Sequence, residues 1–156
     1  MSKLRRAERQ ISLSASWDFV KNSEVIRVGV NTEKRPYIIP LNYVVVNDYI
    51  YFHSAKEGRK VDLFSEGLEV TAELDKLIKI KEEQKGCSYS CYYQSVMIEG
   101  ILFKVFEVEE KVDALNKLVE KYATQDFGKV TSKDVKRVFV YKIEVISITG
   151  KELLPN

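Results

Sequence analysis

Apolar and polar residues alternate along much of the chain, and this pattern predicts a protein built mainly from β-strands. β-branched and aromatic residues gather in runs that short polar segments separate, as is typical of strands joined by turns. Asn47-Asp48 is a turn pair between two such runs, and Gly100 interrupts the longest run, where we expect a bend or bulge. The strands are expected over residues 25–30, 37–46, 49–53, 68–74, 92–108 and 137–148. Six strands with few helices and mostly short turns predict a closed or half-closed antiparallel barrel.

Three segments carry helical signals instead. Residues 109–122 place apolar side chains three or four positions apart, which predicts an amphipathic helix. Residues 56–66 favour a short helix closed by Gly67, and Ser14 is expected to cap another short helix that runs through Val20. Residues 75–85 are rich in Lys and Glu, and the pattern does not decide between a ragged edge strand and a loop.

The length of 156 residues and the 45% hydrophobic content suit one globular domain with a substantial core. We expect this domain over residues 14–150, a basic N-terminal tail over 1–13 that is solvated and partly mobile, and a C-terminal tail over 151–156. Lys3 is one of four cations in the first ten residues. The net charge of +2 is too small for a general polyanion surface, so nucleic-acid binding through the basic N-terminus and exposed aromatic residues is disfavoured.

Composition also bears on location and metal binding. No apolar run approaches the roughly 20 residues of a membrane helix, and the start lacks the apolar stretch of a secretory signal. We therefore expect a soluble cytoplasmic protein without a membrane partner. Cys87 and Cys91 have no second Cys pair or His cluster beside them, so we expect two reduced thiols and no metal site.

The segment from His53 to Lys60 is the best candidate for chemistry, because it joins a strand end to a helix start and carries donors suited to a phosphate. Ser54 offers a hydroxyl, Arg59 and Lys60 offer positive charge, and a new helix presents free N–H groups. Gly58 removes a side chain that would block the approach of an anion. Alone, this pattern is equally typical of a solvated basic turn that opens a surface helix.

Three segments in order resemble one family. They read YIIPLNY over residues 37–43, IYFHSAKEGRK over 50–60 and YQSVMIEG over 93–100. In this combination the chain resembles the pyridoxamine 5'-phosphate oxidase-like proteins, and within them it is most similar to the nitroimidazole-resistance branch. The match covers residues 25–122 and weakens toward residue 148. The resemblance implies an FMN-binding, six-stranded antiparallel split β-barrel with a few peripheral helices, and a homodimer with the flavin at its interface.

The resemblance also assigns residues to the flavin. It implies that one strand runs beside the isoalloxazine ring, with backbone contacts and an Asn42 amide that can donate and accept. It places the His53 loop at the ribityl chain and phosphate, and a facing strand on which Ser95 bonds the flavin and Val96 packs against it. His53, the sole histidine, is either a proton donor or attachment point, or a residue that only bonds the cofactor or a backbone carbonyl. The implied cofactor-binding residues are Ile39, Pro40, Leu41, Asn42, His53, Ser54, Ala55, Gly58, Arg59, Lys60, Gln94, Ser95 and Val96.

The resemblance implies a flavin-dependent reductase of a small aromatic acceptor, such as a nitro compound or a quinone, with a nicotinamide dinucleotide as electron donor. The acceptor would stack on the flavin among tyrosines such as Tyr43 or Tyr93. A non-enzymatic flavin or haem binder shares the fold, and the sequence hardly separates the two. Residues 148–156 lack the arginine-rich signature of the oxidases that act on pyridoxamine phosphate, which argues against vitamin B6 oxidation.

Overall fold

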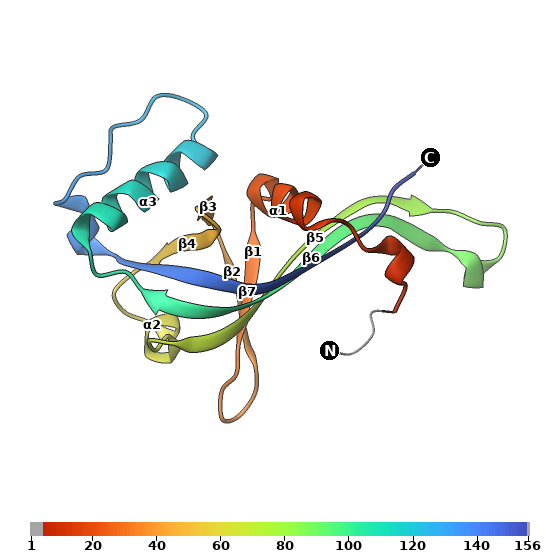
Figure 1. The fold of residues 1–156 in the computed structure, drawn as a ribbon, viewed down its shortest axis with the longest axis horizontal. Helices are drawn as coiled ribbons and strands as arrows, with labels where there is room; N and C mark the ends of the chain where they lie inside the picture. The colour runs from red at the N-terminus through yellow and green to blue at the C-terminus, as the bar shows by residue number, and fades with distance from the viewer. Residues whose placement is uncertain (1–4, 156) are drawn as a thin grey trace.

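Seven antiparallel strands form one curled sheet, a half-barrel with helices at its margins (Figure 1). The computed structural model describes residues 5–155. The strand order is β2-β1-β5-β6-β7-β4-β3, and every neighbouring pair is antiparallel. The strands are β1 Ile26–Val30, β2 Tyr37–Leu41, β3 Val44–Val46, β4 Tyr49–Ser54, β5 Leu68–Lys81, β6 Ser90–Lys104 and β7 Phe139–Leu153. The expected mainly β, half-closed antiparallel barrel is confirmed.

The seventh strand arises because the segment expected as one strand over 37–46 divides at Asn42-Tyr43. β2 pairs with β1, whereas β3 pairs with β4 on the opposite edge of the sheet. Between them, the backbone N–H of Tyr43 donates to the hydroxyl of Tyr122, 3.1 Å away, instead of to a strand. The Tyr43 ring is buried and its own hydroxyl donates to the carbonyl of Val20. Side chains from distant segments therefore redirect the chain here.

Two local turn predictions are confirmed by the backbone. Asn47 and Asp48 have φ values of 49° and 65°, the left-handed conformation that a tight hairpin between β3 and β4 requires. The pairing of β6 with β7 shifts register between Glu99 and Gly100, which is the expected bulge. A Cβ at Gly100 would lie 2.6 Å from the carbonyl oxygen of Glu144, so this position has no room for a side chain.

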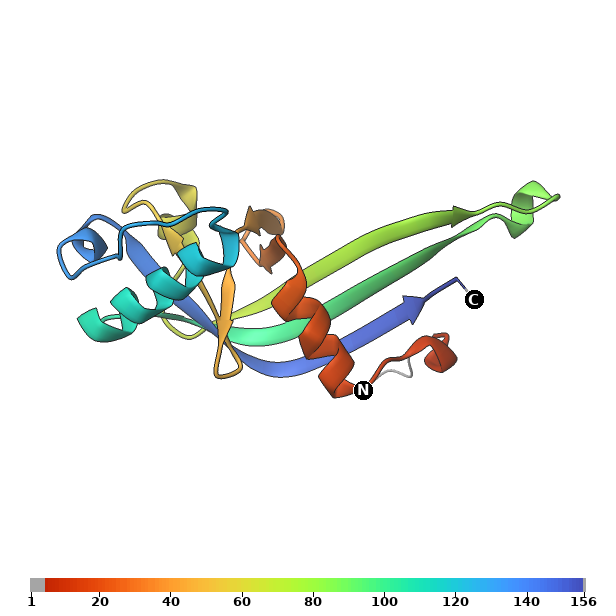
Figure 2. The same ribbon diagram turned by 90° about the horizontal axis from the view of Figure 1, so that it is seen from above.

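β5 and β6 continue past the rest of the sheet as a long two-stranded arm (Figure 2). Residues 75–81, which the sequence left undecided between edge strand and loop, extend β5 and pair with the start of β6. The pairing contains a second irregularity between Leu77 and Lys79. Both faces of the arm are exposed to solvent, which explains why its sequence shows no clear apolar alternation.

Three α-helices flank the sheet: α1 Leu13–Asn22, α2 Arg59–Leu63 and α3 Val108–Tyr122. α3 agrees with its expected span and packs its apolar stripe onto the outer side of β3 and β4. The N-cap of α1 is Ser12, not Ser14 as expected, and its hydroxyl accepts from the N–H of Ala15 at 3.1 Å. α2 has five residues, far fewer than the expected span of 56–66, because Gly58 leaves the helical conformation at φ 105°.

The main core fills the concave side of the half-barrel. Val28, Leu74, Ile98 and Ile143 are completely buried there, and Phe52 is stacked on Tyr141 with ring centroids 5.6 Å apart. Burial of this apolar surface is the main force that holds the curled sheet together. No helix among residues 5–155 is long and apolar enough to span a membrane.

The N-terminal segment is docked against β7, whereas the sequence suggested a solvated, partly mobile tail. The backbone N–H of Ile11 donates to the carbonyl of Gly150 at 3.1 Å, and Gln10 forms a β-bridge with Lys151. Gly150 is the last residue of the expected domain, and β7 continues from it through Lys151 to Leu153, into the segment expected as a C-terminal tail. Lys3 and the final residue, 156, lie outside the described residues.

Candidate functional site

The loop that follows β4 concentrates positive charge beside an unusual backbone conformation. Gly58 adopts φ 105° and ψ 169°, a region that is essentially restricted to glycine. A Cβ at this position would meet nothing within 4 Å, so the glycine is required for conformation and the space beside it is open. Arg59 and Lys60 follow directly as the first residues of α2. Because α2 is so short, these two side chains, and not a helix dipole, must provide most of the attraction for an anion.

Arg59 is held in place by an aromatic ring from another part of the chain. Its guanidinium lies over the ring of Tyr37, 4.2 Å from the ring centroid. Tyr37 begins β2, so this contact joins the loop after β4 to the strand that the resemblance places beside the isoalloxazine ring. The cation–π contact limits the motion of an otherwise exposed arginine, which favours binding of a phosphate.

His53 and Lys60 are electrostatically coupled at the same loop. Partial desolvation, and then the positive charge of Lys60, hold the pKa of the His53 imidazole below its usual value. The ring is therefore neutral at neutral pH, with one nitrogen that donates and one that accepts a hydrogen bond. Such a ring can form a hydrogen bond with a ligand in either direction.

Ser54 is placed differently from the other members of the loop. Its side chain is buried, and the hydroxyl donates to the carbonyl oxygen of Ala55 at 2.7 Å. The hydroxyl thus faces the interior of the half-barrel and is not directed at the open space beside Gly58. Ala55 is exposed and continues the backbone of the loop.

β2 contacts this loop through Tyr37, but only some of the β2 side chains are exposed and able to contact a ligand. Ile39 and Leu41 point into the core, whereas Pro40 and Asn42 point outward. β2 is an edge strand, so one side of its backbone is not paired by any strand in the described chain and can bond a ligand. The Asn42 amide donates a long hydrogen bond of 3.4 Å to the carbonyl of Glu24, which leaves its oxygen available.

The β6 segment lies far from the loop within one chain. Ser54 pairs with Phe139 near the start of β7, and Ser95 pairs with Lys151 near its end. The two partners are twelve positions apart along β7, which corresponds to about 40 Å of extended strand. Figure 1 shows the two ends of β7 at opposite sides of the molecule. One mononucleotide therefore cannot contact both segments of the same chain.

The members of the β6 segment also point in different directions. Val96 is completely buried in the core. Gln94 donates to Glu152 at 3.0 Å, while Ser95 lies on the opposite, outer face of the sheet. Of the two tyrosines expected beside an acceptor, Tyr43 is buried and cannot stack on a ligand, whereas Tyr93 is partly exposed.

The outer face of the sheet carries a hollow of about 760 Å³. Its apolar lining includes three large exposed side chains: Ile38 of β2 at 64% exposure, Met97 of β6 at 48% and Ile146 of β7 at 63%. Ile38 directly follows Tyr37 along β2, but neighbouring side chains of a strand point to opposite faces, so the hollow lies across this strand from the Arg59 contact. An apolar hollow of this size can accept an aromatic ring.

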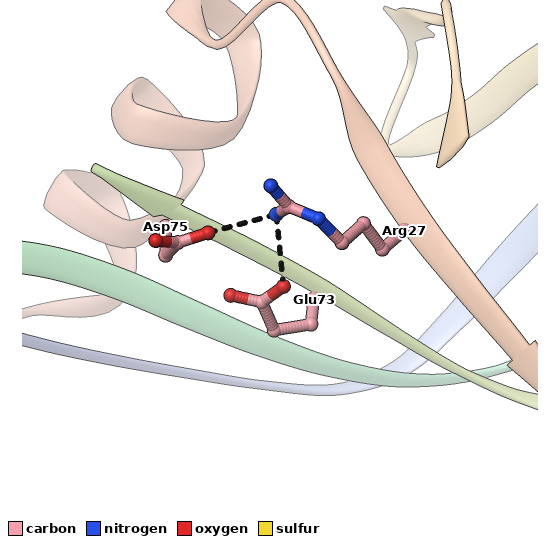
Figure 3. Close-up of polar contacts among 3 residues, drawn as sticks. All are labelled: Arg27, Glu73 and Asp75. Atoms are coloured by element: carbon pink, nitrogen blue, oxygen red, sulfur yellow. Dashed lines mark hydrogen bonds and ion pairs between the residues drawn. The ribbon is translucent and has the colours of Figure 1, made fainter. Parts of the chain in front are cut away.

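Arg27 separates this hollow from a second one of about 720 Å³ beside α1, since it lines both. Its Nη1 donates to the Glu73 carboxylate at 3.1 Å and to Asp75 at 2.7 Å (Figure 3). These contacts cross from β1 to β5 and fix the wall between the two hollows. The sequence does not predict the ion pairs of Arg27 or the contact between Tyr37 and Arg59, because the partners lie more than twenty residues apart and no local pattern indicates such pairs.

The sequence profile of the family described as pyridoxamine 5'-phosphate oxidase matches residues 12–152. No curated protein sequence matches the chain. A candidate 5-nitroimidazole antibiotic resistance protein from Bacteroides thetaiotaomicron is similar in structure, with a TM-score of 0.76 and 28% identity, over 91% of this chain and 85% of that one.

Two more distant structures share the fold. The flavocytochrome Anf3 from Azotobacter vinelandii superposes with a TM-score of 0.86 at 15% identity, over 98% of this chain and 73% of that one. A protein from Mycobacterium smegmatis described as binding FAD and haem gives a TM-score of 0.84 at 15% identity, over 95% of this chain and 76% of that one.

Proposed function

Because the chain belongs to the pyridoxamine 5'-phosphate oxidase family, we propose that it binds FMN and acts as a flavin-dependent reductase of small aromatic acceptors, such as nitro compounds or quinones. The name of the Bacteroides relative points to nitroimidazoles as one class of acceptor. The proposed electron donor is a nicotinamide dinucleotide.

The observation that carries the flavin proposal is the cationic loop at Gly58. Two adjacent cations, a glycine-only backbone conformation and an open space beside it suit the nearly doubly charged phosphate of FMN. The Tyr37 ring holds one of the cations in position and joins the loop to β2, the edge strand proposed to run beside the flavin ring. The residues of this loop therefore fit the phosphate of a flavin mononucleotide.

Each group of residues has a distinct task in this proposal. Arg59 and Lys60 hold the phosphate, and the free edge of β2 with the Asn42 side chain oxygen orients the ring. His53, neutral at neutral pH, donates to or accepts from a ligand atom near Lys60. Bound flavin supplies the redox chemistry, which the side chains alone lack.

We also propose that the protein acts as a homodimer with the flavin at the interface. Ser95 lies too far from the loop to touch the same flavin within one chain, so it would come from a second copy. The exposed apolar side chains Ile38, Met97 and Ile146 give the outer face a surface that a second copy could cover. Sedimentation equilibrium at several protein concentrations tests this part, and a monomer at micromolar concentration contradicts it.

The reductase proposal is tested by loading the purified protein with FMN and following oxidation of NADH or NADPH with a nitroimidazole or a quinone. We expect oxidation that requires protein, flavin and acceptor together. Tight FMN binding without turnover of any acceptor would favour a non-enzymatic flavin binder. Retention of haem in place of flavin, seen as a Soret band, would favour the haem-binding function named for the Mycobacterium relative.

A further inference from the structure

A second cluster of positive charge lies at the opposite end of β7 from the Gly58 loop. It surrounds a cleft of about 340 Å³ between the N-terminal segment and the sheet. Among residues 5–155, the lining combines four cations with a hydroxyl and an aromatic ring and includes no acidic side chain: Arg5, Arg6, Arg9, Ser90, Tyr93 and Lys151.

The cleft exists because the N-terminal segment is fixed to β7. Besides the Ile11 and Gln10 contacts, the Lys151 ammonium donates to the carbonyl of Arg5 at 2.8 Å. A Cβ at Gly150 would lie 2.6 Å from the Ile11 side chain, so only a glycine permits this close approach. In Figure 2 the N-terminal segment runs beside the end of β7. Docking thus gathers arginines that would otherwise repel one another in solution.

The charge of the cleft is only weakly compensated. Within residues 5–155, Arg5 and Arg9 have no carboxylate within ion-pair distance, and Arg6 has one, Glu8, at 3.7 Å. Both members of that pair are more than half exposed, so the contact is weak and screened by water. A group of cations held together without matching acids favours a ligand with several negative charges.

The position of the cleft connects it with the proposed flavin site. Lys151 lies directly across from Ser95 in the pairing of β6 with β7, and both side chains are on the outer face of the sheet. Tyr93 lies two residues before Ser95 on that same face. Directly opposed side chains in a sheet are about 5 Å apart, so the cleft adjoins the residue that would touch the flavin from the second copy.

We propose that this cleft binds the phosphate groups of the nicotinamide dinucleotide that donates electrons; this inference rests on the proposed function. Arginine guanidinium groups bind phosphate oxygens through paired hydrogen bonds, and the Tyr93 ring offers a face on which a base can stack. The small volume suits the diphosphate of one dinucleotide better than a polymer. In this proposal the electron donor binds at the cleft, and the flavin phosphate binds separately at the Gly58 loop.

The test measures binding of NADP by isothermal titration calorimetry, without catalysis, to the FMN-loaded wild-type protein and to Arg6→Ala/Arg9→Ala. We expect at least a tenfold loss of affinity, partial recovery in Arg6→Lys/Arg9→Lys, and no change in Lys129→Ala/Lys133→Ala, which removes two exposed cations elsewhere. Inorganic pyrophosphate should compete with NADP, whereas sulfate at equal ionic strength should not.

Three results would overturn the inference. The first is unchanged NADP affinity in Arg6→Ala/Arg9→Ala. The second is preferential binding of a single-stranded oligonucleotide at the same residues, which would make the cleft a nucleic-acid surface. The third is an equal loss of FMN affinity in the variant, which would assign these arginines to the flavin. Separate titration with FMN distinguishes failure of this inference from failure of the proposed function, because only the latter abolishes FMN binding to the wild-type protein.

Discussion

Replacement of Arg59 and Lys60 by alanine should weaken FMN binding by roughly 100-fold while leaving riboflavin binding unchanged. Riboflavin has the same ring and ribityl chain but no phosphate, so it does not need the two cations. A hydrogen bond to a charged group contributes about 1.5–3 kcal/mol. Arg59 is exposed and Lys60 only partly buried, so we take the lower end of this range for each. Two such contacts give about 3 kcal/mol, which corresponds to roughly two decades in the dissociation constant.

The assay is fluorescence titration of each flavin with the wild-type protein, with Arg59→Ala/Lys60→Ala and with the charge-matched control Lys129→Ala/Lys133→Ala. The control removes the same charge from an exposed loop remote from Tyr37. An equal loss for FMN and riboflavin would show that the two cations support the fold or the ring and not the phosphate. Unchanged FMN affinity would place the phosphate elsewhere.

Three further changes probe the structure around the site and the core. Gly58→Ala should lower the free energy of unfolding by about 1 kcal/mol or more and weaken FMN binding, because φ 105° strains any other residue, whereas Gly128→Ala should have little effect; urea denaturation compares them. Burial lowers the pKa of Lys121 to about 8, so the unfolded state binds more protons above that pH, and stability should rise from pH 8 to pH 9.5. Lys121→Met should lack this rise, and an identical rise in both proteins would argue against the buried ammonium. Partial burial opposes ionisation of Glu110, but its hydrogen bonds from Lys142 and a tyrosine outweigh this and lower its pKa. The resulting stability is present above the unfolded pKa and lost as pH falls through the lower folded pKa, so Glu110→Gln should lose less stability than the wild-type protein between pH 7 and pH 3 in the same denaturation assay.

The parts of the fold that sequence predicts well depend on local signals. The apolar stripe of α3, the Asn47-Asp48 hairpin and the Gly100 bulge each rest on a few adjacent residues, and the structure confirms all three. The N-cap of α1 shows the limit of such local signals. Ser12 and Ser14 are both typical N-cap residues, and the structure shows that Ser12 accepts the capping hydrogen bond.

The parts that sequence could not predict depend on contacts between distant segments. The break between β2 and β3 requires Tyr122, which lies 79 residues beyond Tyr43. The docking of the N-terminal segment depends on the continuation of β7 past Gly150. Local patterns do not reveal these contacts, so they predict one continuous strand over residues 37–46 and a solvated tail over residues 1–13.

The sequence indicates which segments form the candidate site, but it does not predict how these segments are arranged in space. Arg59 and Lys60 stand in the loop where the resemblance placed them, and Tyr37 brings β2 beside that loop. The separation of Ser95 from the loop follows from strand register, which the sequence of a single strand does not reveal. This separation is the reason for proposing a second copy at the flavin.

Flavin binding is tested most directly by equilibrium dialysis of the purified protein against FMN, followed by the absorption spectrum of the retained fraction. We expect one FMN per chain, a visible flavin band, and riboflavin retained roughly 100-fold more weakly because it lacks the phosphate that Arg59 and Lys60 would hold. No retained flavin, or equal retention of FMN and riboflavin, would contradict a phosphate cradle at the Gly58 loop.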